Sequence, residues 1–278
     1  MRPMKWFHAL SLDVVIGALA VGLFASRVLQ VSPPWCWWTV LAASVWSVYT
    51  ADHLLDGNNR GTASQMFRHQ LHYRKQHVFL FFLILIAIYA ITSSMFCFKW
   101  PVIFWGVALG GLVLFYLLFV FVARKNQIYF QKELFVSLIY VLGIWFAPLI
   151  WHGVKPGFAI LMILIIFFLF GWADGLLIAS LDRQRDRDDH QQSFATFYGQ
   201  LKTHRLIIFI LALSGVLSFG GLFFQNVNGI RAAFALLFFM DLVLLLLFIA
   251  PVRFSKSNFY RFFLEAIFWL PAGVIFWI

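Results

Sequence analysis

Two short segments of the chain each carry aspartates four residues apart. The first holds Asp52 and Asp56, and the second holds Asp182 and Asp186, with Asp189 three residues further on. Residues four apart share one face of a helix, so each pair points two like charges the same way and needs a compensating cation. Mg²⁺ is typically held by one or two carboxylates together with substrate phosphates. The spacing favours two Mg²⁺-binding stripes around a diphosphate, and a solvated, salt-bridged helix end is the alternative for either segment alone.

Basic side chains accompany the second segment. Arg183 and Arg187 are also four residues apart, so they form a basic stripe beside the acidic one. Guanidinium groups make charge-assisted hydrogen bonds to phosphate oxygens. The segment therefore suits a metal-bound diphosphate, with Arg183 as a candidate phosphate ligand.

Three further acids fall within apolar runs. Asp174 precedes Asp182 by eight residues, which is about two helical turns, so it lies on roughly the same face. An acid inside an apolar run is costly and is functional by default. Asp174 is expected either to face a pocket or to make a structural hydrogen bond. Asp241 and Glu265 lack comparable neighbours, which favours structural hydrogen bonds between helices.

Three histidines, His69, His72 and His77, lie near one another in the sequence. Their spacings of three and five residues do not put all three on one helical face. Alternation with Arg68 and Lys75 is more typical of a basic patch that faces phosphate or lipid than of a metal site.

The elements that must position these residues are apolar helices. Hydrophobic residues make up 63 % of the 278 residues and charged residues 12 %, against roughly 45–50 % and about 25 % in soluble domains. A chain this apolar needs lipid as its main solvent, and a transmembrane helix needs about 20 apolar residues. The sequence predicts an all-α polytopic membrane protein with nine transmembrane helices, at about 9–31, 34–56, 77–97, 100–123, 133–152, 157–181, 204–225, 230–251 and 259–278.

Lys and Arg are divided unequally between the two ends of these segments. If the N-terminus lies on the inner side of the membrane, the Lys and Arg residues on the outer side are only Arg27, Lys99, Lys155 and Arg231. The positive-inside rule therefore predicts a cytoplasmic N-terminus and cytoplasmic aspartate segments. We expect an integral protein of the bacterial inner (plasma) membrane.

The longest polar segments, 57–76 and 182–203, fall on that same predicted inner face, so the function is expected there. No linker separates a second domain, and residues 1–278 are interpreted as one transmembrane domain. The net charge of +10 mostly reflects topology. It suits anionic membrane lipids and does not require nucleic acid as a partner.

The second segment resembles the second motif of the UbiA superfamily of intramembrane prenyltransferases, D-x-x-x-D-x-x-x-G-x-x-S-(x)5-G. Its positions are Asp182, Asp186, His190, Ser193 and Gly199, with His190 in place of the first glycine.

The first segment is similar to the first motif of the same superfamily, N-x-x-x-D-x-x-x-D, which is often followed by an arginine. Asp52 and Asp56 fit this pattern and Arg60 follows, but Val48 stands where the family has asparagine. The chain is therefore interpreted as a divergent member.

The resemblance implies a helical bundle around a central cavity and Mg²⁺-dependent transfer of a prenyl group from a prenyl diphosphate to a lipophilic or aromatic acceptor. It assigns catalytic roles to Asp182 and Asp186. For a reaction of this kind, Asp174, noted above as an acid within an apolar run, is a further catalytic candidate that could orient or deprotonate the acceptor. The remaining assignments are Asp52, Asp56, Asp182 and Asp186 for the metal, Arg60, Lys125, Lys132 and Arg183 for the diphosphate, and Asp189, His190 and Ser193 as support for the second motif.

Two other functions fit the same residues. The substitution at Val48 leaves room for a terpene cyclase or synthase that ionises a prenyl diphosphate without an acceptor. A non-catalytic transporter or lipid-binding protein would explain the charged face by topology alone. The acceptor, the prenyl chain length and the oligomeric state depend on pocket geometry rather than on these motifs.

Overall fold

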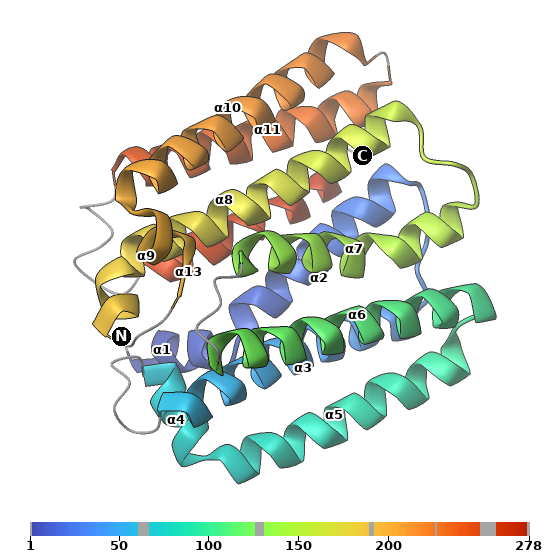
Figure 1. Ribbon diagram of the computed structural model, residues 1–278. Coiled ribbons are helices and arrows are strands. Elements are labelled where there is room, and N and C mark those ends of the chain that lie inside the picture. The colour runs from blue at the N-terminus through green and yellow to red at the C-terminus, as the bar shows by residue number, and fades with distance from the viewer. Residues whose placement is uncertain are drawn as a thin grey trace.

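The computed structural model describes residues 2–60, 67–125, 131–188, 192–225, 227–250 and 260–276 (Figure 1). Every regular element in these ranges is helical, which confirms the all-α prediction. The elements are α1 (Arg2–Ala9), α2 (Leu12–Val28), α3 (Trp35–Arg60), α4 (Phe67–Arg74), α5 (Gln76–Cys97), α6 (Trp100–Lys125), α7 (Lys132–His152), α8 (Phe158–Asp188), α9 (Phe194–Tyr198), α10 (Gln200–Phe224), α11 (Asn228–Ile249), α13 (Tyr260–Ile267) and the 3-10 helix η2 (Leu270–Phe276).

Six of the described helices, α5, α6, α7, α8, α10 and α11, are long and apolar enough to cross a membrane. Of the other predicted spans, α2 has 17 residues, and α3 ends in a polar stretch that carries the first aspartate pair. The ninth predicted span is divided between α13 and η2. Pro271 lies in η2, and proline removes a backbone donor and clashes with the preceding helical turn.

The long helices lie side by side in one bundle (Figure 1). Helices α10 and α11 form one edge, α5 lies at the other, and α8 and α7 lie between them. Helix α5 has no buried residue, and an apolar helix with this exposure is suited to contact with lipid. Helix α8 carries much of the core, because Phe167 and Phe170 are fully buried.

Two glycines set the close approach of α7 to α8. A Cβ added at Gly171 would lie 2.8 Å from Ser137 Oγ, and one added at Gly175 would lie 3.1 Å from Glu133 Cβ. Ser137 Oγ donates a hydrogen bond to the carbonyl of Phe168, 2.5 Å away. The glycines therefore bring the first two turns of α7 against the half of α8 that leads to the second aspartate pair.

The short helices α1, α4 and α9 gather at one end of the bundle, together with the N-terminus (Figure 1). The last turns of α3 and α8 reach the same end, which is called the motif end below. Both aspartate pairs lie on these helical extensions. The helical four-residue spacing assumed from the sequence is therefore present in both segments.

Candidate functional site

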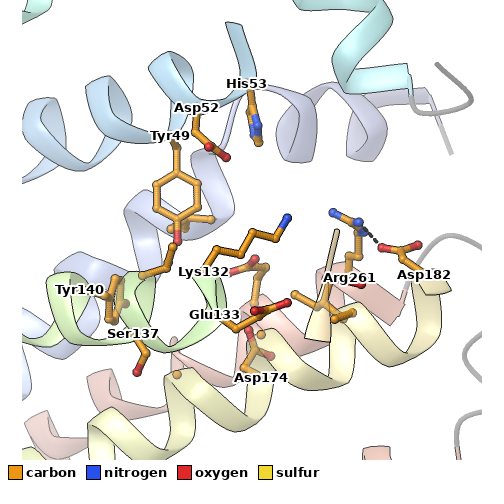
Figure 2. Close-up of a pocket in the computed structure, with 18 of the residues that line it drawn as sticks. Tyr49, Asp52, His53, Lys132, Glu133, Ser137, Tyr140, Asp174, Asp182 and Arg261 are labelled. Atoms are coloured by element: carbon orange, nitrogen blue, oxygen red, sulfur yellow. Dashed lines mark hydrogen bonds and ion pairs between the residues drawn. The ribbon is translucent and has the colours of Figure 1, made fainter. Parts of the chain in front are cut away.

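A cavity of about 190 Å³ opens among the helices near the motif end (Figure 2). Helices α3, α7, α8 and α13 provide most of its polar lining, and α2, α4 and α6 contribute further side chains. Segments far apart in the sequence meet here, so the cavity is a product of the packed bundle and not of any single motif.

Both aspartate pairs line this one cavity. Asp52 and Asp56 come from α3, and Asp182 and Asp186 come from α8. Asp56, Asp182 and Asp186 are each at most 5 % exposed. The carboxylates of the two segments thus reach a common space from different helices, in an arrangement that a divalent ion and a diphosphate could bridge.

Asp182 is held by three side chains. The guanidinium of Arg261 forms an ion pair with it, and the hydroxyl of Tyr260 donates a hydrogen bond to it. Arg185 Nη1 lies 3.2 Å from the carboxylate and 3.2 Å from the Tyr260 hydroxyl. Tyr260 and Arg261 were not identified from the sequence. The one signal for them was a basic residue next to the start of the ninth apolar segment.

Asp186 is held differently, by the segment that follows α8. The Ser193 side chain hydrogen-bonds to Asp186, and the positive charge of Lys132 interacts with the Asp186 carboxylate. Ser193 also caps α9, because its backbone N–H donates to Thr196 Oγ1 at 2.8 Å and its hydroxyl accepts from the Thr196 N–H. The serine offset seen in the second motif therefore corresponds to a hydrogen bond to the second aspartate.

Glu133 is a cavity residue that sequence reasoning missed. One of its oxygens accepts a hydrogen bond of 3.2 Å from the Phe194 N–H, which ties α7 to α9. Its other oxygen, Oε2, is buried and has no hydrogen-bond partner among the described residues. Glu133 interacts electrostatically with Asp186, so it adds a further carboxyl group beside the second aspartate pair.

The lining is strongly acidic. Among the described residues that line the cavity, seven carboxyl side chains stand against three Lys or Arg side chains. Buried carboxyl groups are either protonated or compensated by cations, and oxygen-only ligands favour Mg²⁺ over softer metals. The acids are Asp52, Asp56, Glu133, Asp174, Asp182, Asp186 and Glu265, and the bases are Arg68, Lys132 and Arg261.

No three acidic, histidine or cysteine side chains of the described residues already converge as a ready metal site. The residues fit Mg²⁺ in the manner typical of phosphate-binding enzymes, where one or two carboxylates hold the ion and the substrate phosphates complete its coordination. The buried, unpartnered Oε2 of Glu133 is one atom with capacity to spare for such an ion.

Arg68 reaches the cavity from α4. Burial lowers the pKa of its guanidinium to about 10, and the nearby Arg261 also lowers it, whereas Asp182 and Asp56 favour the charged form. A pKa of about 10 still leaves Arg68 charged at neutral pH. It is thus a cation at the motif end, placed where a phosphate could be bound.

The residues predicted from the sequence to bind diphosphate lie in different places. Lys132 lines the cavity, but Arg183 does not. Arg183 follows Asp182 directly, and one residue turns a helix by about 100°, so its side chain leaves the cavity side; the guanidinium groups that line the cavity are those of Arg68 and Arg261. The side chains of Arg60 and Lys125 lie outside the described ones, and Asp189 and His190 lie outside the described residues altogether.

Asp174 and Glu265 line the deep part of the cavity. Asp174 thus faces a pocket, as one of its two sequence readings proposed. Glu265 was expected to bond structurally between helices, and the structure corrects this, because Glu265 projects from α13 into the same space. Asp241 does follow that expectation: it accepts a hydrogen bond from Ser214 and so links α11 to α10.

Histidine at position 72 is part of the support for α4 and not of the cavity lining. It is 1 % exposed, its Nδ1 lies 2.8 Å from the carbonyl of Arg68, and its ring stacks on Phe79 with centroids 4.0 Å apart. His72 therefore holds the turn that presents Arg68.

No protein-family model and no curated protein sequence matches the chain. Solved structures do. A UbiA homolog from Archaeoglobus fulgidus bound to GPP and Mg²⁺ matches with a TM-score of 0.64 and 12 % identity, over 99 % of both chains. A UbiA homolog from the same archaeon bound to DMAPP and Mg²⁺ matches with a TM-score of 0.62 and 12 % identity, over 98 % of both chains. The chain has the UbiA fold, and the resemblance inferred from the two motifs is confirmed at that level.

Proposed function

We propose that this protein transfers a prenyl group from a prenyl diphosphate to an acceptor within the membrane, in a reaction that depends on Mg²⁺. One observation carries the proposal: two aspartate pairs from α3 and α8 line a single acidic cavity together with Arg68, Lys132 and Arg261. The UbiA fold supports it, and the two similar structures are described as bound to a prenyl diphosphate and Mg²⁺.

The aspartate pairs would hold Mg²⁺ at the diphosphate end of the substrate. Asp52 and Asp56 act from one wall and Asp182 and Asp186 from the other. Mg²⁺, when bound, neutralises charge that develops on the departing diphosphate. Ser193 keeps Asp186 oriented through its hydrogen bond.

Basic side chains would bind the phosphate oxygens that are not coordinated by Mg²⁺. Lys132 and Arg68 line the cavity and act as phosphate donors. Arg60 and Lys125 are proposed to join them from the ends of α3 and α6. Arg261 is committed to Asp182 and is best described as the residue that positions this metal ligand.

Loss of diphosphate leaves an allylic cation, which needs a dry, electron-rich surrounding. Tyr49, Tyr140 and Phe268 line the cavity, and the faces of aromatic rings attract cations. Asp174 is proposed to orient or deprotonate the acceptor that then attacks this carbon.

An acceptor-free cyclase and a transporter are the alternatives. The deep part of the cavity carries two tyrosines and two carboxyl groups, and this polarity favours a second, polar substrate over cyclisation of a hydrocarbon. Release of diphosphate with a hydrocarbon product and no acceptor would establish the cyclase, and binding or exchange of substrate without Mg²⁺ would favour the transporter.

The test uses purified full-length protein in lipid nanodiscs with geranyl diphosphate and Mg²⁺. We expect Mg²⁺-dependent binding that is lost with EDTA and reduced at least about tenfold in Asp182→Asn and Asp186→Asn, because charge-assisted ligands contribute roughly 1.5–3 kcal/mol each. Asp188→Asn is the matched control, since Asp188 lies on the same helix but is exposed and bonded to Gln184. Equal binding in all three variants would refute the proposal.

A further inference from the structure

The deep end of the cavity has a polar lining of its own. Tyr49, Tyr140, Asp174 and Glu265 reach it from four different helices, α3, α7, α8 and α13. These four residues are called the inner end below. Figure 2 shows Tyr49, Tyr140 and Asp174 on the side of the cavity away from Asp182 and Arg261. Asp174 and Asp182 are eight residues apart on α8, or about 12 Å at 1.5 Å per residue, so the inner end is separate from Asp182 and its partner Arg261.

Asp174 has a carboxylate oxygen that is available to a ligand. The residue is 6 % exposed, and its Oδ1 is buried without a hydrogen-bond partner among the described residues. Buried polar atoms in folded proteins are almost always hydrogen-bonded, and exceptions call for a functional explanation. Because Asp174 lines the cavity, the atom is placed to accept a hydrogen bond from a molecule bound there.

The charge of the inner end restricts which molecule that is. Glu265 interacts electrostatically with Asp174, and Tyr49 lies in the field of both acids. Two cations of the lining act on these acids. Arg261 acts on both and is itself paired with Asp182, and Arg68 acts on Glu265 from α4. A ligand carboxylate or phosphate would add another negative charge where screening is weak. A hydroxyl group would instead donate to the unpartnered oxygen.

We propose that the inner end is the acceptor site, and that it takes an acceptor with a hydroxyl group and no anionic group. Glu265 is assigned to this site beside Asp174. The inference rests on the proposed prenyl transfer. It differs from the expectation of any lipophilic or aromatic acceptor, because it excludes aromatic acids and phosphorylated lipids.

The chemistry of the transfer balances with these groups. The bond between the prenyl C1 and the diphosphate oxygen breaks, and its electron pair leaves with the diphosphate. The acceptor oxygen forms the new bond to C1, its O–H bond breaks, and the proton passes to the Asp174 carboxylate. No oxidant, reductant or further substrate is required.

The first experiment asks which acceptor is used. Purified protein in nanodiscs is incubated with labelled geranyl diphosphate, Mg²⁺ and a lipid and metabolite extract of the expression host, and the labelled products are identified by mass spectrometry. The expected product carries no carboxylate or phosphate on the acceptor part. A labelled acidic acceptor would overturn the proposal, and so would Mg²⁺-dependent binding of geranyl diphosphate with no transfer product. Absence of that binding would instead refute the proposed function itself.

The second experiment compares matched acceptors that differ in the presence of an anionic group, 4-hydroxybenzamide with 4-hydroxybenzoate and glycerol with glycerol 1-phosphate, as substrates or as competitors of the extract acceptor. We expect the neutral member to be preferred at least about tenfold, because a like-charge contact is unfavourable where screening is weak. Glu265→Gln should narrow this preference and keep Mg²⁺-dependent diphosphate binding, whereas Asp174→Asn should keep that binding but abolish transfer, because it removes the proposed proton acceptor. Asp241→Asn, a buried acid bonded to Ser214 outside the cavity, should leave the preference and the binding unchanged. An equal or inverted preference in the wild-type protein would refute the assignment.

Discussion

Arg261 on α13 forms an ion pair with Asp182 on α8, across 79 residues of sequence. The pair is buried, with side-chain exposures of 11 % and 1 %. It connects the second aspartate segment to α13. The orientation of a proposed metal ligand therefore depends on a residue outside both motifs.

Replacing Arg261 should therefore lower both stability and metal-dependent binding. Arg261→Gln leaves a buried carboxylate without its main counter-charge, and breaking a buried pair in this way typically costs about 3–5 kcal/mol. Thermal unfolding in detergent and binding of Mg²⁺ with geranyl diphosphate are the measurements. Arg231→Gln is the control, since Arg231 is an exposed arginine that donates to the Gln225 carbonyl. The same unfolding temperature in both variants would contradict the structural role of the pair.

Ser193→Ala should weaken the response to Mg²⁺ more than it weakens the fold. The hydroxyl both hydrogen-bonds to Asp186 and caps α9, and loss of a helix cap costs about 1 kcal/mol. We expect half-saturation of geranyl diphosphate binding to need several-fold more Mg²⁺, because Asp186 loses a donor that orients it. Ser94→Ala removes a hydroxyl bonded to the Ala90 carbonyl on α5 and should not shift the Mg²⁺ titration. A shift of equal size in that control would count against an effect through Asp186.

Gly221 and Gly220 on α10 should respond in opposite ways to alanine. A Cβ at Gly221 would lie 2.3 Å from ring atoms of Phe234, which is fully buried, whereas at Gly220 the nearest atom is 4.0 Å away. Alanine is otherwise preferred over glycine in a helix by about 1 kcal/mol. We expect Gly221→Ala to lower the unfolding temperature and Gly220→Ala to leave it unchanged or raise it. Equal behaviour of the two variants would argue against the close packing of α10 on α11.

Stability should fall as the pH is lowered, partly through His72. Burial lowers the pKa of His72 below 6.5, and the charge on Arg68 lowers it further, although the hydrogen bond to the Arg68 carbonyl opposes this. The unfolded chain then binds the proton more tightly than the folded one. The contribution of His72 is complete above about pH 6.5 and is lost as the pH falls from there through the folded pKa.

Unfolding temperatures of the wild-type protein and His72→Gln between pH 7.5 and 5.5 measure this contribution. His53 faces His72 with ring centroids 5.3 Å apart, so His53→Gln is measured as well. We expect the unfolding temperature to change less with pH in His72→Gln than in the wild type. An unchanged dependence on pH in that variant would mean that the pKa of His72 does not differ between the folded and unfolded chain.

We propose that the motif end faces the cytoplasm, which follows from the distribution of Lys and Arg. Cys97 is the last residue of α5 and is exposed. It lies two residues before Lys99, which the Lys and Arg distribution places on the outer side of the membrane. In a Cys36→Ser background, a membrane-impermeant maleimide should label Cys97 in right-side-out spheroplasts. When Cys97 is also replaced by serine, the maleimide should label Asp188→Cys only after permeabilisation. The reverse pattern would invert the proposed orientation.

The sequence by itself determined the helical class, the approximate limits of most long helices and the two aspartate pairs. These are local properties: apolar runs of membrane-spanning length, and carboxylates at a spacing that puts them on one face of a helix. The serine eleven positions after Asp182 was also readable, and the hydrogen bond of Ser193 to Asp186 gives that offset a physical meaning.

Only the tertiary structure decided which faces of the helices meet. The sequence placed Arg183 with the phosphate ligands, but its position on α8 turns it away, while Arg261 and Arg68 reach the cavity from segments with no motif. Glu265 looked isolated along the chain, yet it shares the inner end with Asp174. Such contacts depend on how α13 and α4 pack against α3 and α8, and no local pattern encodes them, because each residue finds its partner on another helix.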